Sequence, residues 1–254
     1  MAEFYVWNIN FYKRKRFLII SAIFIIVAFF LWFNRTSLLP YAKGELPVVF
    51  TKGNKDLENI SLTFNVSWGD EKIYDILAVL EKQNVVATFF LSGEWAERHP
   101  EIIEKIVEQK HEIGILGYRY KSYLEQDLQK VRQDLYLAQD VFNKLGLDDL
   151  KLLRAPHGHL NEEVIELAKN LGFSIVHWNV NPNDWKNPGS DVITENVLKN
   201  TNKGDIILLH ASDSAKQTSK ALKDILPRLK EKGFTLVTAS ELITQVETKS
   251  KLIH

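Results

Sequence analysis

The sequence predicts an α/β fold whose parallel strands close into an irregular (β/α) barrel of seven or eight units. Three observations lead to this prediction. Short apolar or β-branched runs alternate with segments of helical periodicity along most of the chain. No glycine-rich phosphate-binding loop follows any of the predicted strands. Polar residues gather just after several strands, and in a barrel these positions share one rim.

Seven runs have the length and composition of buried strands, and the segments between them carry apolar residues at helical spacing. The predicted strands cover 61–64, 87–91, 112–116, 151–153, 173–180, 205–209 and 234–238, and the predicted helices lie near 73–80, 102–107, 124–145, 164–171 and 222–229. The longest helix alternates apolar residues at spacings of four and three, which would also suit a coiled coil. Because it holds only about three heptads, packing on a sheet is favoured.

Strands that alternate with helices imply parallel strands joined by right-handed crossovers. Both a doubly wound sheet and a barrel satisfy this pattern. The missing glycine-rich loop weakens the nucleotide-binding doubly wound sheet. Asn65, Arg154, Asn181–Asp184 and His210 each follow a strand, and a barrel brings such positions to one face. The barrel is therefore preferred.

The N-terminal stretch predicts a membrane anchor. Residues 13–16 are all basic and precede residues 17–33, in which only Ser21 is polar. A helix of this length spans about 25 Å, near the lower limit for crossing a bilayer. The basic flank predicts a single-pass cell-membrane protein with a cytoplasmic N-terminus and an extracytoplasmic domain. A cleaved signal peptide is the alternative, but residues 32–35 lack the small side chains of a cleavage site.

Composition divides the chain into five parts. These are a short cytoplasmic basic segment (1–16), a transmembrane anchor (17–33), a linker with a first strand (34–56), the α/β domain (57–243) and a polar tail (244–254). A chain of 254 residues with 45% hydrophobic residues can bury one full core. Its 32 basic and 32 acidic residues balance, so no nucleic-acid partner is predicted. Because cysteine is absent, disulfides and thiolate chemistry are excluded.

Three predicted loops supply groups that could act on a substrate. His210 ends an apolar strand, and a lone histidine there is more often a satisfied core residue. Asp184 could accept a hydrogen bond from one ring nitrogen and turn the other toward a substrate, raising the imidazole pKa as a general acid requires. Arg154 stands in a turn with Pro156 and Gly158 and would suit a carboxylate or an oxyanion, while a structural salt bridge is an equal alternative.

Together these motifs resemble the NodB-homology domain of the polysaccharide deacetylases, carbohydrate esterase family 4, over roughly residues 57–243. The stretches 89–92, 95–100 and 207–218 are most similar to the sporulation-associated PdaB type. The resemblance implies a distorted (β/α) barrel. It also implies removal of N-acetyl groups from N-acetylglucosamine-type sugars by water on a divalent metal.

The base and metal positions implied by the resemblance hold other residue types here. The first family motif, Thr-Phe-Asp-Asp, is Thr63-Phe64-Asn65-Val66. Asn65 therefore stands in the place of the general base, and Val66 in that of a metal ligand. The two histidine ligands of the second motif are replaced by Leu116 and Tyr120.

The other motifs carry the acid half of the implied site. Arg-x-Pro-x-Gly is intact at residues 154–158 and the final histidine at His210, while the fourth motif keeps Asp184-Trp185 but begins with Asn181. The resemblance thus implies catalytic roles for His210, Asp184 and Arg154 beside the Asn65 position. The expected glycan contacts are Trp185, Tyr120, Pro156 and Gly158.

The resemblance implies zinc or cobalt, yet Val66 and Leu116 at two of the ligand positions cannot bind a cation, so the family pattern predicts no metal site. Asp70 could turn back from the first loop, although a solvated or helix-capping aspartate is the commoner role. His157 and His159 have an H-x-H spacing that can chelate a metal. Two histidines without a fixed carboxylate make a weak site.

Two functions follow from these residues. One is a membrane-anchored polysaccharide deacetylase that acts on cell-envelope or spore-cortex glycan through a divergent arrangement. The other is a catalytically inactive homologue that binds glycan or an envelope partner during sporulation. An amide cannot take a proton as a carboxylate does, and a metal would lower the pKa of water from about 15.7 to about 7. Standard metal-dependent catalysis is therefore disfavoured, and peptidoglycan or a related glycan is the expected partner in both cases.

Overall fold

The computed structural model describes residues 49–251, which belong to one compact unit of the chain. The predicted basic segment (1–16) and the predicted membrane anchor (17–33) lie outside the described residues, as does most of the predicted linker. Within the described range, no helix combines the length and the apolar character that crossing a bilayer requires.

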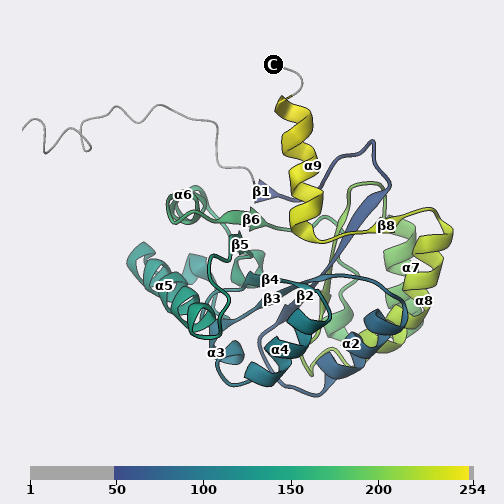
Figure 1. The fold of residues 1–254 in the computed structure, drawn as a ribbon, viewed down its shortest axis with the longest axis horizontal. Coiled ribbons are helices and arrows are strands. Elements are labelled where there is room, and N and C mark those ends of the chain that lie inside the picture. Colours follow the sequence, from purple (N-terminus) through teal and green to yellow (C-terminus); the bar gives the residue numbers. More distant parts are fainter. Residues whose placement is uncertain (1–48, 252–254) are drawn as a thin grey trace, which may run out of the picture. The chain divides into compact units, whose positions relative to one another are not determined.

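A single curled sheet of parallel strands forms the centre of the fold (Figure 1). Its strands are β1 (Val49–Phe50), β2 (Asn59–Val66), β3 (Thr88–Leu91), β4 (Glu112–Ile115), β5 (Leu152–Leu153), β6 (Ser174–Val176), β7 (Ile206–His210) and β8 (Thr235–Leu236). The order across the sheet is β1-β6-β5-β4-β3-β2-β7, and β8 pairs with the start of β2. β2 is buried along nearly all of its length, as expected for a strand with neighbours on both sides.

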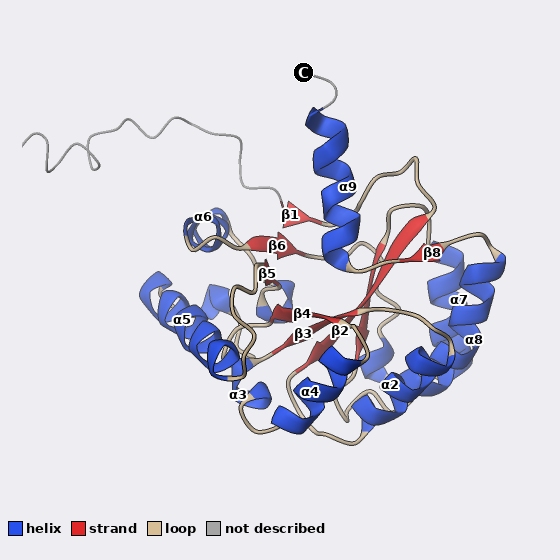
Figure 2. Ribbon diagram, in the orientation of Figure 1, coloured by secondary structure: helices blue, strands red, loops and turns tan. Residues whose placement is uncertain are grey.

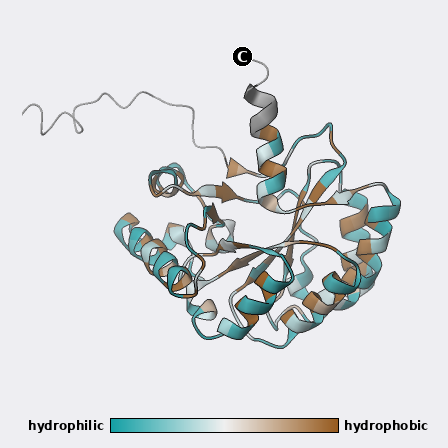
Figure 3. Ribbon diagram, in the orientation of Figure 1, coloured by the Kyte–Doolittle hydropathy of each residue, from teal (hydrophilic) through white to brown (hydrophobic). Residues whose placement is uncertain are grey.

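Helices surround the strands, and Figure 2 shows them at the periphery of the domain. They are α2 (Lys72–Lys82), α3 (Gly93–Ala96), α4 (Pro100–Glu108), α5 (Leu128–Lys144), α6 (Glu162–Asn170), α7 (Ser190–Asn200), α8 (Thr218–Glu231) and α9 (Ala239–Lys251), with 3₁₀ turns η1 (Tyr123–Glu125), η2 (Pro156–Gly158) and η3 (Asp184–Lys186). Figure 3 shows apolar strands and helices of mixed hydropathy, as expected when each helix buries one side on the sheet.

Two apolar clusters form the core on opposite faces of the sheet. In β3, Phe89 and Leu91 belong to the large cluster between the sheet and the helices, whereas Phe90 belongs to a smaller cluster. Successive strand residues point to opposite faces, so the smaller cluster fills the inside of the curl. Leu242 and Ile243 of α9 join this inner cluster. The start of the last helix therefore packs against the inner cluster, and the helix continues beyond residue 243, where the sequence predicts the polar tail to begin.

The sheet is a curled half-barrel. Among the described residues, two isolated bridges connect the β1–β6 side with β7, Lys52 with Asp205 and Val180 with Ile207. An ion pair of 2.6 Å between Lys52 Nζ and Asp205 Oδ1 reinforces the first bridge. The predicted parallel α/β architecture is thus confirmed in its curled form.

Two elements differ from their predicted bounds for local reasons. The helix expected over 124–145 begins at Leu128, because the Asp127 side chain accepts a hydrogen bond from the Lys130 N–H and caps it there. The strand expected over 173–180 ends at Val176. Beyond it, the carbonyls of Val176 and His177 accept hydrogen bonds from Arg154.

Candidate functional site

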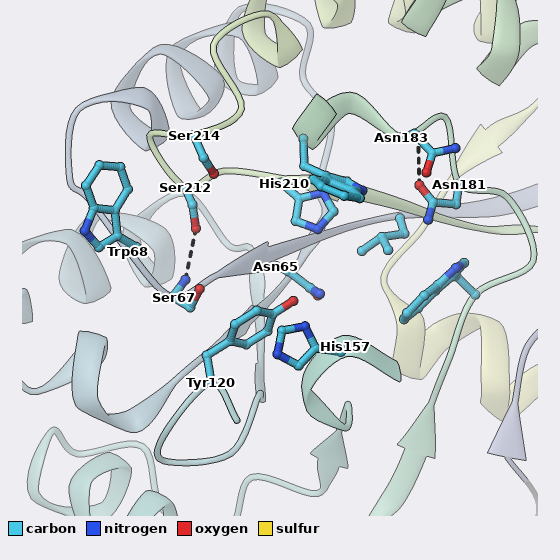
Figure 4. Close-up of a pocket in the computed structure, with 13 residues that line it drawn as sticks. Asn65, Ser67, Trp68, Tyr120, His157, Asn181, Asn183, His210, Ser212 and Ser214 are labelled. Atoms are coloured by element: carbon cyan, nitrogen blue, oxygen red, sulfur yellow. Dashed lines mark hydrogen bonds between the residues drawn. The ribbon is translucent and has the colours of Figure 1, made fainter. Parts of the chain in front are cut away.

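A pocket of about 400 Å³ opens beyond the carboxyl ends of β2 and β7 (Figure 4). Its volume lies within the range of small-ligand sites. It is lined by Asn65, Ser67, Trp68, Tyr120, His157, Trp178, Asn181, Asn183, Trp185, Leu208, His210, Ser212 and Ser214. Asn65 and His210 are register partners on the neighbouring strands β2 and β7, so the sheet itself places them side by side.

Asp184 and His210 form a buried acid–imidazole pair. The carboxylate is fully buried and accepts hydrogen bonds of 2.8 Å from His210 Nδ1, 2.8 Å from the His210 backbone N–H and 2.7 Å from Thr218 Oγ1. Because a carboxylate only accepts, Nδ1 carries the proton. The other ring nitrogen, Nε2, is therefore the one left for the pocket, as the sequence pattern led us to expect.

Arg154 lies beneath the pocket floor and holds Asn65. Its guanidinium is fully buried and donates to Asn65 Oδ1 at 3.1 Å and to the carbonyls of Val176 and His177 at 3.0 and 3.1 Å. All three acceptors are neutral. Burial lowers the pKa of the Arg154 guanidinium to about 9, so it remains charged at neutral pH. Arg154 acts on the pocket through Asn65, since its own side chain is not exposed.

Tyr120 brings a hydroxyl to the same place. Its ring packs on His157 with 4.3 Å between centroids, and Figure 4 shows Asn65, Tyr120 and His157 gathered at the base of the pocket. Burial raises the pKa of the Tyr120 hydroxyl, while hydrogen bonds from the Asn65 side chain and the His157 backbone and the charge of Arg154 act against this rise. The tyrosine oxygen is therefore already an acceptor within the protein.

A second carboxylate fixes the loop that carries Tyr120. Asp134 of α5 accepts hydrogen bonds of 2.9 Å from the backbone N–H groups of Tyr118 and Arg119, and one of 3.0 Å from the Tyr123 hydroxyl. Tyr120 follows these anchored residues directly. The sequence signal for this role is weak, because Asp134 stands in the middle of a predicted helix.

The aromatic residues at the pocket offer flat surfaces to a ligand. Trp68 is 63% exposed and Trp185 is 48% exposed, and both line the pocket. Trp178, just beyond the end of β6, packs against the inner core cluster and also lines the pocket. Tryptophan rings of this kind can stack on sugar rings.

The Arg154 turn keeps its shape through tight packing. Gly158 has a φ of +73°, and a side chain there would meet the rings of Trp178 and His177. Pro156 begins the 3₁₀ turn η2 and is buried. Neither Pro156 nor Gly158 lines the pocket. Both therefore shape the wall that Trp178 and His157 present.

The candidate substitute ligands form no metal site among the described residues, because the rings of His157 and His159 lie 5.6 Å apart between centroids but no carboxylate joins them. Asp70 is exposed and does not line the pocket; its backbone N–H, with those of Glu71 and Lys72, donates to the Asp213 carboxylate. His159 Nδ1 is 2.8 Å from Ser122 Oγ and does not line the pocket either.

Asp213 also joins two walls of the pocket. Through these three bonds it caps the start of α2 from the loop after β7. Gly69, with a φ of +76°, packs against the same carboxylate, and a side chain there would collide with it. The loop of Trp68 and the loop of Ser212 and Ser214 are held together in this way. Sequence separations of more than 140 residues hide such contacts from pattern analysis.

Comparison with known proteins identifies the family to which this chain belongs. Residues 52–176 match the family model described as polysaccharide deacetylase. A peptidoglycan-N-acetylglucosamine deacetylase of Bacillus cereus is 34% identical over 189 residues, which are 72% of this chain and 87% of that protein. The chain belongs to the polysaccharide deacetylase family.

Solved structures of the family extend the comparison. This polysaccharide deacetylase homologue matches a crystal structure of a peptidoglycan N-acetylglucosamine deacetylase with a TM-score of 0.74 and 32% identity, covering 76% of this chain and 92% of that one. It matches a family pseudoenzyme of Bacillus anthracis with the same TM-score and 28% identity, covering 78% of this chain and 70% of that one. A mutant of that pseudoenzyme is described as having restored enzymatic activity.

The metal implied for a polysaccharide deacetylase does not fit the residues present. Val66 and Leu116 are fully buried apolar side chains packed in the two core clusters, and Tyr120 packs on His157. Between residues 49 and 251, no group of three or more His, Cys, Asp or Glu side chains lies close enough to hold a metal ion. The pocket lining contains two histidines and no carboxylate. No step of a mechanism is therefore assigned to a metal.

Proposed function

We propose that this chain is a glycan-binding member of the polysaccharide deacetylase family that does not hydrolyse its ligand. The observation that carries this proposal is the hydrogen bond from Arg154 to Asn65, at the position where the resemblance implies a general base. The amide oxygen accepts from a guanidinium, and the amide nitrogen cannot take a proton from water. The lining of the pocket contains no carboxylate and the described residues offer no metal site, so the two groups that would activate water in the implied reaction are both missing, and the His210 imidazole is left to take a proton.

The ligand we propose is peptidoglycan or a related polymer of N-acetylglucosamine-type sugars. Two findings support it. The relatives at 34% and 32% identity are named as peptidoglycan-N-acetylglucosamine deacetylases. The pocket also presents exposed Trp68 and Trp185 beside hydroxyl and amide groups, a combination that suits a sugar. A spore-cortex ligand and a PdaB-type role in sporulation are the finer form of this proposal, supported by the motif stretches of the sequence.

We further propose that residues 17–33 anchor the protein in the cell membrane, with the N-terminus in the cytoplasm and the deacetylase-like domain outside. The support is the basic flank and the apolar run of the sequence. Such an anchor would hold the pocket close to the glycan of the envelope. A protease added to intact cells tests this orientation. It should digest a domain that lies outside the membrane, whereas a cytoplasmic domain would be protected until the cells are lysed.

The second candidate function is a hydrolase with a divergent arrangement. The intact pair of His210 and Asp184 favours it, because this geometry is the one a general acid needs. In this arrangement His210 would have to take a proton from the attacking water and then give one to the leaving amine, without a metal site among the described residues or a carboxylate in the pocket lining to help. We therefore rank this function second.

One experiment separates the two functions. The full-length chain in detergent is incubated with N-acetylglucosamine tetramers and with purified peptidoglycan, with and without zinc, cobalt or manganese. Free acetate and bound protein are both measured. We expect binding without acetate release. Acetate release that disappears in His210→Ala would overturn the non-hydrolytic function and establish the divergent hydrolase.

A further inference from the structure

The orientation of the Asn65 amide is fixed from below. Arg154 can only donate hydrogen bonds, so the atom of Asn65 that faces it must be the oxygen. The amide nitrogen is therefore the atom left for Tyr120 and the pocket. A carboxylate at this position would instead present an acceptor. The floor of this pocket has the opposite polarity, that of a hydrogen-bond donor.

Tyr120 adds a second donor beside the first. Its oxygen accepts hydrogen bonds from the Asn65 side chain and the His157 backbone. A phenol oxygen that accepts from the protein has its own O–H left to donate. The Asn65 amide has two N–H bonds, and only one is needed for Tyr120. Two donors thus converge at the base of the pocket, where Figure 4 shows both side chains.

No formal charge lines the pocket apart from what His210 and His157 can carry. The lining contains no Asp, Glu, Lys or Arg. Two charged groups, Arg154 and Asp184, lie fully buried behind Asn65 and His210. A cationic ligand would therefore lose hydration on entering without gaining a carboxylate partner.

We propose that the pocket reads the acetylation state of the glycan, binding N-acetylated sugars and rejecting their deacetylated forms; this rests on the proposed glycan-binding function. The acetamido oxygen accepts hydrogen bonds from Asn65 Nδ2 and Tyr120 O–H. His210 Nε2, unprotonated in the neutral ring, accepts from a sugar hydroxyl or from the acetamido N–H. A protonated amine has only donors, which face the donors of Asn65 and Tyr120 and the positive charge of Arg154 behind them.

The test compares two tetrasaccharides by calorimetric titration of the full-length chain in detergent. One is fully N-acetylated and the other is fully de-N-acetylated, at a pH where the free amines are protonated and at constant salt. We expect the acetylated ligand to bind at least about tenfold more tightly. Equal affinities, or tighter binding of the amine, would overturn the acetyl preference and leave glycan binding standing. If neither ligand binds, both proposals fail.

Two variants locate the preference in the named atoms. Asn65→Asp replaces the donor by a carboxylate, so the affinity ratio should fall toward one or reverse. Asn143→Asp adds the same charge at an exposed position of α5 and should leave the ratio unchanged. Tyr120→Phe removes only the hydroxyl and should weaken the acetylated ligand several-fold while leaving the amine unaffected. A ratio that is unchanged in both pocket variants would contradict the assignment of these two donors.

Release of acetate during the titration would have a separate meaning. It would overturn the non-hydrolytic function, while the ratio of the two affinities would still decide the acetyl preference. The comparison of the two ligands on the unaltered protein needs no variant to fold.

Discussion

Arg154 Nη1 and Asn65 Oδ1 are joined by a 3.1 Å hydrogen bond beneath the pocket, and the guanidinium has only neutral acceptors. Taking a charge out of water costs free energy that neutral acceptors recover only in part. Burial accordingly lowers the pKa of Arg154 to about 9. A carboxylate oxygen in place of the amide nitrogen at position 65 would therefore give this buried guanidinium a negatively charged partner.

Asn65→Asp should raise the free energy of unfolding at neutral pH by about 1–3 kcal/mol, because a carboxylate would then face the guanidinium. The positive charge should hold the pKa of the introduced carboxyl below its usual value of about 3.9. The gain is therefore present above that value and lost as pH falls through the lower folded pKa. Urea unfolding at pH 7 and in acid measures it. A variant no more stable than the parent at pH 7 would count against this argument.

His111 should make the protein sensitive to mild acid. Its Nδ1 accepts from the Ala87 N–H at 3.2 Å, its Nε2 has no hydrogen-bond partner among the described residues, and burial lowers its pKa from 6.5 to about 4. As pH falls below 6.5, the unfolded chain takes up the proton first. Stability is therefore complete above pH 6.5 and declines toward pH 4, by about 3 kcal/mol at about 1.4 kcal/mol per pH unit.

The variant His111→Asn keeps an acceptor for the Ala87 N–H and cannot titrate. It should flatten the pH dependence of unfolding between pH 6.5 and 4, although the loss of the ring costs some stability at every pH. Urea unfolding of the parent and the variant across this range provides the measurement. If both proteins lose the same free energy, another group is responsible.

Trp68 and Trp185 should supply affinity without supporting the fold. Replacing either by alanine removes a ring that is largely accessible at the pocket, 63% exposed in Trp68 and 48% in Trp185, so we expect affinity for an N-acetylglucosamine tetramer to fall about five- to tenfold. The melting temperature should change little, because exposed side chains contribute little to stability. Tyr136→Ala is the matched control, since Tyr136 is 52% exposed on α5 outside this pocket. An equal loss of affinity in the control would argue against stacking.

Asp205 should be a polar residue on which the stability of the half-barrel depends. It is fully buried and accepts from Lys52 Nζ at 2.6 Å, Asn179 Nδ2 at 2.6 Å and the Asn202 N–H at 2.7 Å. Asp205→Ala leaves these donors unpaired and should cost about 3–5 kcal/mol of unfolding free energy. Lys52→Met should cost less, because the lysine is partly exposed. Denaturant unfolding gives the order of the two losses, and the reverse order would refute it.

Much of the fold could be predicted because its signals are local. The strand of residues 61–64 and the helix of residues 102–107 are apolar at periods of two to four residues, and the structure has β2 and α4 there. The extent of β6 could not be predicted. Its end depends on the Arg154 side chain, which binds the carbonyls that a longer strand would use.

Single residues of the candidate site could be predicted from the sequence, whereas the contacts that hold its loops together could not. His210 and Asp184 could be named because each follows an apolar strand or stands in a motif, and the structure joins them at 2.8 Å. Ser67 and Ser212 gave no signal, since small polar residues are common in loops. The roles of Asp134 and Asp213 depend on donors in other segments of the chain, which no periodicity reveals.

The contact between Gly69 and Asp213 restricts which residues can occupy two positions that are far apart in the sequence. Any side chain at position 69 meets the carboxylate, and loss of the carboxylate leaves three N–H groups at the start of α2 without their acceptor. A side chain at position 69 would therefore force the carboxylate away, and the three N–H groups would lose their acceptor. We therefore expect the Trp68 loop and the loop after β7 to change together among homologues. The width of the pocket at this side should then differ by whole loop rearrangements, and single substitutions should alter it little.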